Sequence, residues 1–224
     1  LITKRINDLK YIEICWYGGE PLLASEIIKR LNTHTISEIN KNELKTIFNS
    51  DITTNGYNLD IKLATELSIV GVNSYQISID GDKEHHNKTR IKANGEGTFD
   101  KIWNNLLELK NSNLNFLVTI RYHINEDNFE NSFKFIRQIE SIFLCDDRFN
   151  LLVKAIGRYG GKNDGKINPL NDSHENLLKN SIDKYSDTNK FEENYICYAS
   201  KPNSFVIRAD GSINKCTVAL YDDI

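Results

Sequence analysis

Strand-like and helix-like segments alternate along most of this chain, and that alternation limits the folds it can adopt. Short runs rich in Ile, Val, Tyr, Phe and Thr predict strands at residues 11–17, 47–54, 74–80, 115–123 and 149–156. Amphipathic stretches between them predict helices at about 24–40, 60–70, 98–112 and 127–142. A Gly- and Asn-rich loop at 157–173 and one more helix follow. The sequence therefore predicts parallel strands with right-handed helical crossovers, in an α/β barrel, a partial barrel or an open sheet.

Size and charge narrow the class of protein. The 224 residues are 39% hydrophobic, which is enough for a sizeable core. A formal net charge of -3 gives no basic surface for nucleic acid or anionic lipid. No apolar run approaches the roughly 20 residues that span a bilayer. We therefore expect a soluble cytoplasmic protein with no nucleic-acid or membrane partner. Because the chain begins at Leu1 and contains no Met, we also expect a piece of a longer protein.

The segment "WYGGEPLL" follows the first expected strand and suggests a ligand site. In parallel α/β folds, ligands bind at the carboxyl ends of the strands. Gly18 and Gly19 can adopt positive φ and let their backbone approach a ligand closely. Glu20 adds an acceptor for a cation, and Pro21 suits the first turn of a helix. The tetrapeptide would suit an ammonium group, although a plain strand-to-helix turn explains it equally well.

Similar segments follow the next two strands, and together they resemble a known family. "GGEPLL", "TTNG" and "SIDGDKEHHNKTR" occur in the order found in radical S-adenosylmethionine (SAM) enzymes, and the resemblance is closest to the SPASM branch, which modifies peptides and proteins. It extends over about residues 10–220. The resemblance implies a partial (β/α)6 barrel that lacks its first strand, at residues 1–190, and the start of a small SPASM β-hairpin region at 191–224.

The resemblance also implies roles for single residues in binding SAM. Gly18, Gly19, Glu20 and Pro21 would hold the methionyl amino group. The SAM carboxylate would be bound by Ser78 of the "SxDG" pattern, which also contains Asp80, and by Arg90, whose planar fork suits a carboxylate. Asn55 would contact SAM or substrate, and Leu151 and the residues up to Ile156 would line the adenine side. Each residue also has a plain alternative: a strand face for Ser78, a turn for Asp80 with Gly81, and a surface ion pair for Arg90.

Two neighbouring positions call for separate interpretation. Family members usually have Asp where this chain has Asn87, so a supporting role at that position is in doubt. His85 and His86 are adjacent on an expected loop without a third ligand at suitable spacing. We interpret these histidines as solvated or capping side chains and assign no zinc.

The four cysteines do not supply the expected iron–sulfur loop. Radical SAM enzymes bind a 4Fe-4S cluster through a C-x3-C-x2-C loop after the first strand, and this motif is absent from the chain. The resemblance would place that loop upstream of residue 1, with residues 1–10 as the end of the first helix. Cys15 and Cys145 are expected to be ordinary buried or semi-buried thiols.

Cys197 and Cys216 belong to a different pattern, C-x13-G-x4-C, with an expected hairpin turning at Asp210 and Gly211. This pattern resembles the opening of a SPASM domain, in which both cysteines would be ligands of one or two auxiliary 4Fe-4S clusters. A disulfide between them is the alternative, which an intracellular compartment disfavours.

The resemblance implies an enzyme that cleaves SAM reductively and abstracts hydrogen from a peptide or protein, with flavodoxin or ferredoxin as electron donor. Formylglycine formation and peptide crosslinking are both candidate outcomes. Two alternatives stay open: a barrel that only binds a peptide or nucleotide, and a phosphate-binding α/β barrel unrelated to SAM.

Overall fold

The structure, a computed structural model of the 224-residue chain, describes residues 2–158, 165, 167–182 and 196–217. The chain divides into two compact units, Leu1–Asp187 and Thr188–Ile224. No helix among the described residues is long and apolar enough to cross a membrane.

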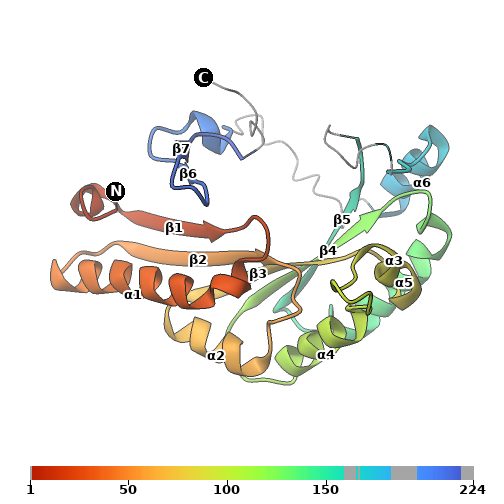
Figure 1. Ribbon diagram of the computed structural model, residues 1–224, viewed down its shortest axis with the longest axis horizontal. Coiled ribbons are helices and arrows are strands. Elements are labelled where there is room, and N and C mark those ends of the chain that lie inside the picture. The colour runs from red at the N-terminus through yellow and green to blue at the C-terminus, as the bar shows by residue number, and fades with distance from the viewer. Residues whose placement is uncertain (1, 159–164, 166, 183–195, 218–224) are drawn as a thin grey trace. The chain divides into compact units, whose positions relative to one another are not determined.

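The first unit is built on a five-stranded parallel sheet (Figure 1). Its strands are β1 (Tyr11–Trp16), β2 (Ile47–Thr54), β3 (Val72–Ile79), β4 (Leu117–Ile124) and β5 (Phe149–Ala155). They lie side by side in sequence order, so every connection moves one strand along in the same direction. This topology confirms the expected α/β fold with parallel strands.

Each connection between neighbouring strands contains a helix, and these helices cover one face of the sheet (Figure 1). They are α1 (Ser25–Lys41), α2 (Ile61–Ile69), α4 (Phe99–Lys110) and α5 (Phe129–Ile142), all at expected positions. The 3-10 helix η2 (Pro21–Ala24) precedes α1, and α6 (Asp172–Ile182) is the additional helix expected after the long loop.

Two segments differ from the expectation. The short helix α3 (Lys83–Thr89) lies within "SIDGDKEHHNKTR", where we expected a loop. It begins because the Asp82 carboxylate accepts a hydrogen bond from the His85 amide and caps the helix. Described residues 2–10 contain the 3-10 turn η1 (Ile6–Asp8) where the end of a helix was expected, and Leu9 is already extended where the chain enters β1.

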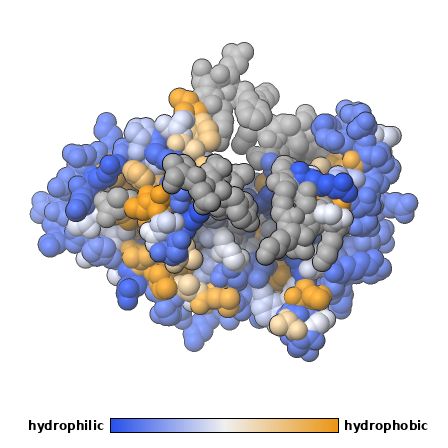
Figure 2. Space-filling view, turned by 45° about the horizontal axis from the view of Figure 1, so that its top comes forward, coloured by the Kyte–Doolittle hydropathy of each residue, from blue (hydrophilic) through white to orange (hydrophobic). Residues whose placement is uncertain are grey.

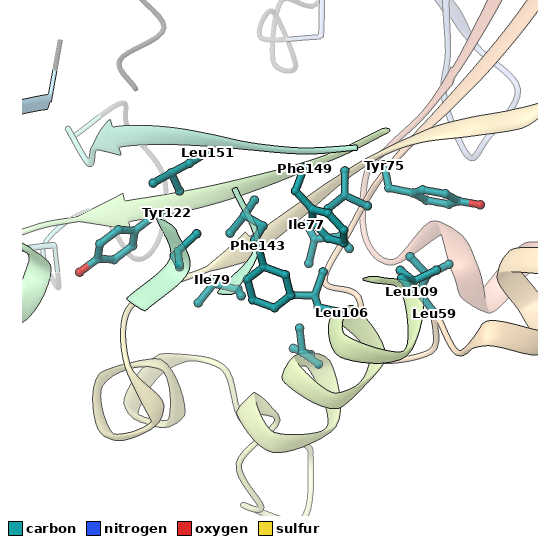
Figure 3. Close-up of a cluster of buried hydrophobic side chains, with 14 of the residues drawn as sticks. Leu59, Tyr75, Ile77, Ile79, Leu106, Leu109, Tyr122, Phe143, Phe149 and Leu151 are labelled. Carbon is teal, nitrogen blue, oxygen red and sulfur yellow. The ribbon is translucent and has the colours of Figure 1, made fainter. Parts of the chain in front are cut away.

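The helix-facing side of the sheet forms the core. Figure 3 shows Ile77, Ile79, Tyr122 and Leu151 from the strands packed toward residues that include Leu106 of α4. Full burial of one such side chain contributes about 1.5–3 kcal/mol. The other face of the sheet carries mostly polar and charged side chains, and we call it the polar face. Hydrophilic residues also dominate the described surface in Figure 2.

The second unit contains a small hairpin of β6 (Val206–Ile207) and β7 (Ile213–Asn214), which pair antiparallel. Gly211 has φ 85°, a conformation that favours glycine, so the chain turns where the sequence predicted. The hydroxyls of Tyr198 and Thr217 are hydrogen-bonded to each other at 2.6 Å. This contact joins the residue that follows Cys197 to the residue that follows Cys216. Among the described residues, which include all four cysteines, no disulfide is present.

Candidate functional site

Three predicted site residues, Glu20, Asn55 and Asp80, lie just after the ends of β1, β2 and β3, and Glu20 fixes the first of these ends. One oxygen of its carboxylate accepts hydrogen bonds from the Leu22 amide at 3.0 Å and from the Thr54 hydroxyl at 2.6 Å. The other oxygen accepts from the Asn55 amide at 2.8 Å. Glu20 therefore caps η2 and ties the turn after β1 to the end of β2.

The two glycines before Glu20 leave their backbone accessible. Gly18 and Gly19 have φ values of 86° and 54°, which favour glycine. A Cβ built on either glycine meets no atom within 4 Å, so space adjoins both. Packing therefore does not require glycine at these two positions. Their positive φ values favour glycine, and the absence of a Cβ also lets a ligand approach the backbone closely. Pro21 is the first residue of η2 and is buried.

The end of β2 forms a second tight turn. The Asn55 side chain accepts a hydrogen bond from the Tyr57 amide at 2.8 Å, and the Thr54 hydroxyl accepts from the Gly56 amide at 3.0 Å. Gly56 has φ 75°, and a Cβ there would lie 2.8 Å from a methyl group of Ile77. Thr54 and Ile77 are register partners in β2 and β3. Asn55, which follows Thr54, is therefore held by its own turn beside Ser78, which follows Ile77.

Asp80 organises the end of β3. Its carboxylate accepts hydrogen bonds from Arg90 Nε at 2.6 Å and Nη2 at 3.3 Å, and it contacts His123 Nδ1 of β4 at 2.9 Å. Burial alone raises the pKa of Asp80, but the His123 hydrogen bond and the Arg90 charge outweigh burial and hold the pKa well below its usual range. Asp80 is therefore a carboxylate near neutral pH and clamps two cationic or dipolar groups.

His86 supports this clamp from within the core. The expectation of a solvated or capping side chain on a loop is wrong for His86, which is 0% exposed and lies on α3. Its Nδ1 accepts from the Asp80 amide at 3.3 Å, so Nε2 carries the hydrogen and donates to the Thr98 hydroxyl at 3.0 Å. Thr98 donates in turn to the Arg90 carbonyl at 2.8 Å. Burial lowers the pKa of His86 to about 4.

Asn87 has a structural part in the same region. Its side-chain oxygen accepts hydrogen bonds from the amides of Thr98 at 3.0 Å and Phe99 at 3.1 Å. These amides lie at the start of α4 and would otherwise lack helical partners. Asn87 therefore caps α4 from a different helix.

The structure places the remaining predicted residues on two different faces. Ser78 lies on the polar face, next to Arg121 of β4 in the register. Leu151 lies on the helix-facing side, 8% exposed within the core cluster, so it is not brought together with Ser78. Its neighbour Leu152, the register partner of Arg121, faces the other way. Burial thus assigns the apolar pair "LL" of β5 to opposite faces.

Sequence reasoning missed His123 and Arg121. Both belong to the alternating half of β4 that faces away from the core, while Val118, Ile120 and Tyr122 are buried. The signal was present in "LVTIRYHI", where polar residues recur at every second position. Placing them near Ser78 and Asp80 needed the register between β3 and β4.

A third group lies on the polar face between β1 and β2. Single ligand atoms of Glu13, Cys15 and Asp51 lie within 4.8 Å of one another. Cys15 and Cys145 are both exposed, so the expectation of buried or semi-buried thiols is wrong for each. Cys15 is exposed because its side chain is on the polar face of an edge strand.

Comparison with known proteins identifies the family. The sequence model of the Radical SAM superfamily matches residues 2–136. The chain belongs to the radical SAM superfamily. No match is found among curated protein sequences.

Solved structures agree at the level of the fold. Histidine-tagged anSMEcpe with bound AdoMet, an anaerobic sulfatase-maturating enzyme, superimposes with a TM-score of 0.69 at 21% identity, covering 99% of this chain and 62% of that one. Native anSMEcpe with bound AdoMet and Kp18Cys peptide gives a TM-score of 0.65 at 19% identity, with 99% and 65% covered. The chain thus spans less than two thirds of the length of these enzymes.

Radical SAM proteins use SAM together with a 4Fe-4S cluster, and the described residues fit the first of these groups. The open Gly18–Gly19 backbone offers carbonyls to an ammonium group, and Ser78 and Arg90 offer donors to a carboxylate. A 4Fe-4S cluster needs about four thiolates, or three with SAM. Cys15 is on one edge strand and Cys145 precedes the opposite edge strand, so these cysteines do not form such a set.

Proposed function

We propose that the intact protein binds SAM at the carboxyl ends of β1–β3. The turn held by Glu20 presents the backbone of Gly18 and Gly19 to the amino group of SAM. Ser78 and Arg90 bind its carboxylate, and Asn55 contacts SAM or substrate. The observation that carries this proposal is the Asp80 clamp, because it holds Arg90 through Nε and Nη2, while Nη1 makes no hydrogen bond to the described residues.

The structure suggests a change in the role of Glu20. Among the described residues it makes three hydrogen bonds, all to groups of the chain itself, so its main contribution is to position the glycine turn. Its second oxygen has one protein partner and retains capacity for an ammonium hydrogen. Pro21 then acts by starting η2 directly after this carboxylate.

Bound SAM, together with a 4Fe-4S cluster, would supply radical chemistry for removing a hydrogen atom from the substrate. The residues of this chain would bind and orient SAM. We propose that the cluster ligands belong to a C-x3-C-x2-C loop outside these 224 residues.

We further propose a peptide or protein as substrate and a flavodoxin or ferredoxin as electron donor. One similar structure contains Kp18Cys peptide with AdoMet, which supports a peptide substrate. Residues 191–224 would begin a SPASM domain, with Cys197 and Cys216 as ligands of an auxiliary cluster. The contact between Tyr198 and Thr217 supports a common site for the two cysteines, because it joins the residues that follow them.

Calorimetric titration of SAM into the anaerobically reconstituted full-length protein tests the proposal. Ser78→Ala and Arg90→Ala should each weaken binding by roughly 1.5 to 3 kcal/mol for a hydrogen bond involving a charged group. That loss corresponds to about a 10- to 150-fold increase in Kd. Arg137→Ala, on the exposed face of α5, is the matched control and should leave the Kd unchanged.

Glu20→Ala should weaken SAM binding as well, and it should also lower stability because three hydrogen bonds are lost. Unchanged SAM affinity in both Ser78→Ala and Arg90→Ala would refute the assignment. SAM binding by the wild type without any cleavage would favour the alternative of a binding-only barrel.

A further inference from the structure

The polar face of the sheet is divided by charge. On β1 and β2 it carries Glu13 and Asp51. Asp51 is the register partner of Cys15, which lies two residues after Glu13 on the same face. On β4 and β5 it carries Arg121, His123 and Lys154, with Lys154 the register partner of His123. One side of this face is therefore acidic and the opposite side basic.

Arg121 is the unusual member of the basic side. It is partly buried and its Nε is fully shielded from solvent, yet no hydrogen bond or ion pair to it exists among the described residues. Shielding a guanidinium from water without a partner is unfavourable. A bound anion would offset that cost.

Other arginines of the chain show how this cost is usually met. Arg148 donates to the Asp146 carboxylate and to three backbone carbonyls. Arg90 is paired with Asp80. Arg137 is exposed, so water can solvate it. Arg121 has neither protein partners in the described part of the chain nor full exposure.

The position of Arg121 relates it to the proposed SAM site without making it part of that site. It is the register partner of Ser78, one strand further from the glycine turn. SAM has a single carboxylate, and the proposed function assigns that group to Ser78 and Arg90. A second anion would therefore satisfy Arg121.

We propose that Arg121 binds a carboxylate of the substrate, and that the enzyme prefers acidic peptides. This inference rests on the proposed function, because it takes the SAM carboxylate to be bound elsewhere. A guanidinium pairs bidentately with a carboxylate, and Lys154, diagonal to Arg121 across β4 and β5, adds positive charge within reach of long side chains. The carboxylate comes from an Asp or Glu side chain or from a peptide C-terminus.

The test uses the full-length, anaerobically reconstituted protein with SAM present. The probe is a random, N-acetylated peptide library prepared in two forms, with amidated and with free C-termini. Peptides retained at equilibrium are sequenced for wild type, Arg121→Gln, Arg121→Lys and the control Arg137→Gln. SAM affinity is measured by calorimetry for the same four proteins.

We expect wild type and Arg137→Gln to enrich acidic residues in the amidated library, or free C-termini if a terminal carboxylate is the ligand. Arg121→Gln should lose the enrichment. Arg121→Lys should retain part of it, because lysine keeps the positive charge that binds the carboxylate. SAM Kd should stay within about twofold in all four proteins.

Two results would overturn the inference. Wild type could enrich no anionic peptide in either library. Alternatively, Arg121→Gln could raise the SAM Kd by about tenfold or more while the peptide preference persists, which would make Arg121 a SAM ligand. A wild-type protein that binds no SAM would instead refute the proposed function. The peptide comparison would still test whether Arg121 binds an anion.

Discussion

Two carboxylates, one after β1 and one after β3, each fix a local geometry through different partners. Glu20 accepts hydrogen bonds mainly from backbone amides and so fixes the path of a turn. Asp80 accepts from the side chains of Arg90 and His123 and so fixes the direction of a guanidinium. Asn128 completes the second arrangement, because its amide donates to the carbonyls of both Asp80 and His123 at 2.9 Å. A site that must hold a charged ligand gains from such preformed contacts, since less freedom is lost on binding.

The buried His86 predicts how stability depends on pH. Its pKa falls from 6.5 to about 4 on folding because burial disfavours the charged form. Below pH 6.5 the unfolded chain binds a proton at His86 that the folded protein does not, so the free energy of unfolding should fall as the pH drops toward 4. The full effect is about 3 kcal/mol.

His86→Gln tests this linkage. Glutamine can accept from the Asp80 amide and donate to Thr98, but it does not titrate. Urea unfolding at about pH 7 and pH 5 should show a smaller pH dependence for the variant than for wild type. The lowered pKa of Asp80 affects stability only at more acidic pH, because its contribution is lost as the pH falls below the unfolded value of about 4. An equal slope in both proteins would contradict a neutral, buried His86.

At the scale of elements, the strands were the most predictable part. Each expected strand matches the observed one to within two residues at either end, because strand-forming residues and turn residues alternate clearly. The helix α3 was missed because "DKEHHNKT" has no apolar periodicity, and its cap and the buried His86 became visible only in three dimensions. The face of Leu151 could not be deduced either, since the apolar pair "LL" fits both phases of a strand. The partnership of Asp80 with His123 spans 43 positions and depends on strand register.

The start of α4 offers a prediction at this scale. Asn87 of α3 caps α4, and Gly97 lies so close to the Asn87 side chain that an added Cβ would collide with it. Asn87→Ala should cost about 1–2 kcal/mol of stability for the lost cap. Asn87→Asp should keep the cap, and its charge should favour the helix N-terminus.

A double-mutant cycle separates the two effects. Gly97→Ala should destabilise the wild type by forcing Asn87 to move, typically by about 1–3 kcal/mol for overpacking. In the Asn87→Ala background the same substitution should cost much less, because the colliding atoms are gone. Additive losses, measured by thermal or urea unfolding, would show that Asn87 and Gly97 do not interact as the structure indicates.

At the scale of the whole molecule, the two faces of the sheet differ. The apolar face packs against the helices and forms the core, whereas the polar face carries the residues of the proposed sites. The helices cover the first face, and the second unit is a separate compact body of residues 188–224. Within the polar face, the glycine turn, the Asp80 clamp and Arg121 follow one another from β1 to β4. This order would place SAM nearer β1 and an acidic substrate nearer β5.

The distribution of cysteines over the molecule leads to the last prediction. Within the first unit, Cys15 and Cys145 belong to opposite edges of the sheet, and within the second unit Cys197 and Cys216 form one pair, so neither unit by itself contains three neighbouring thiols. Because a 4Fe-4S cluster needs about four thiolates, or three with SAM, the 224-residue chain alone should retain less than one cluster after anaerobic reconstitution. In the full-length protein, Cys197→Ala or Cys216→Ala should lower iron and sulfide content by up to one cluster, whereas Cys145→Ala, the matched control, should not. Stoichiometric 4Fe-4S in the 224-residue chain would contradict the placement of the cluster loop outside these residues. Unchanged iron in both variants would return Cys197 and Cys216 to a structural role.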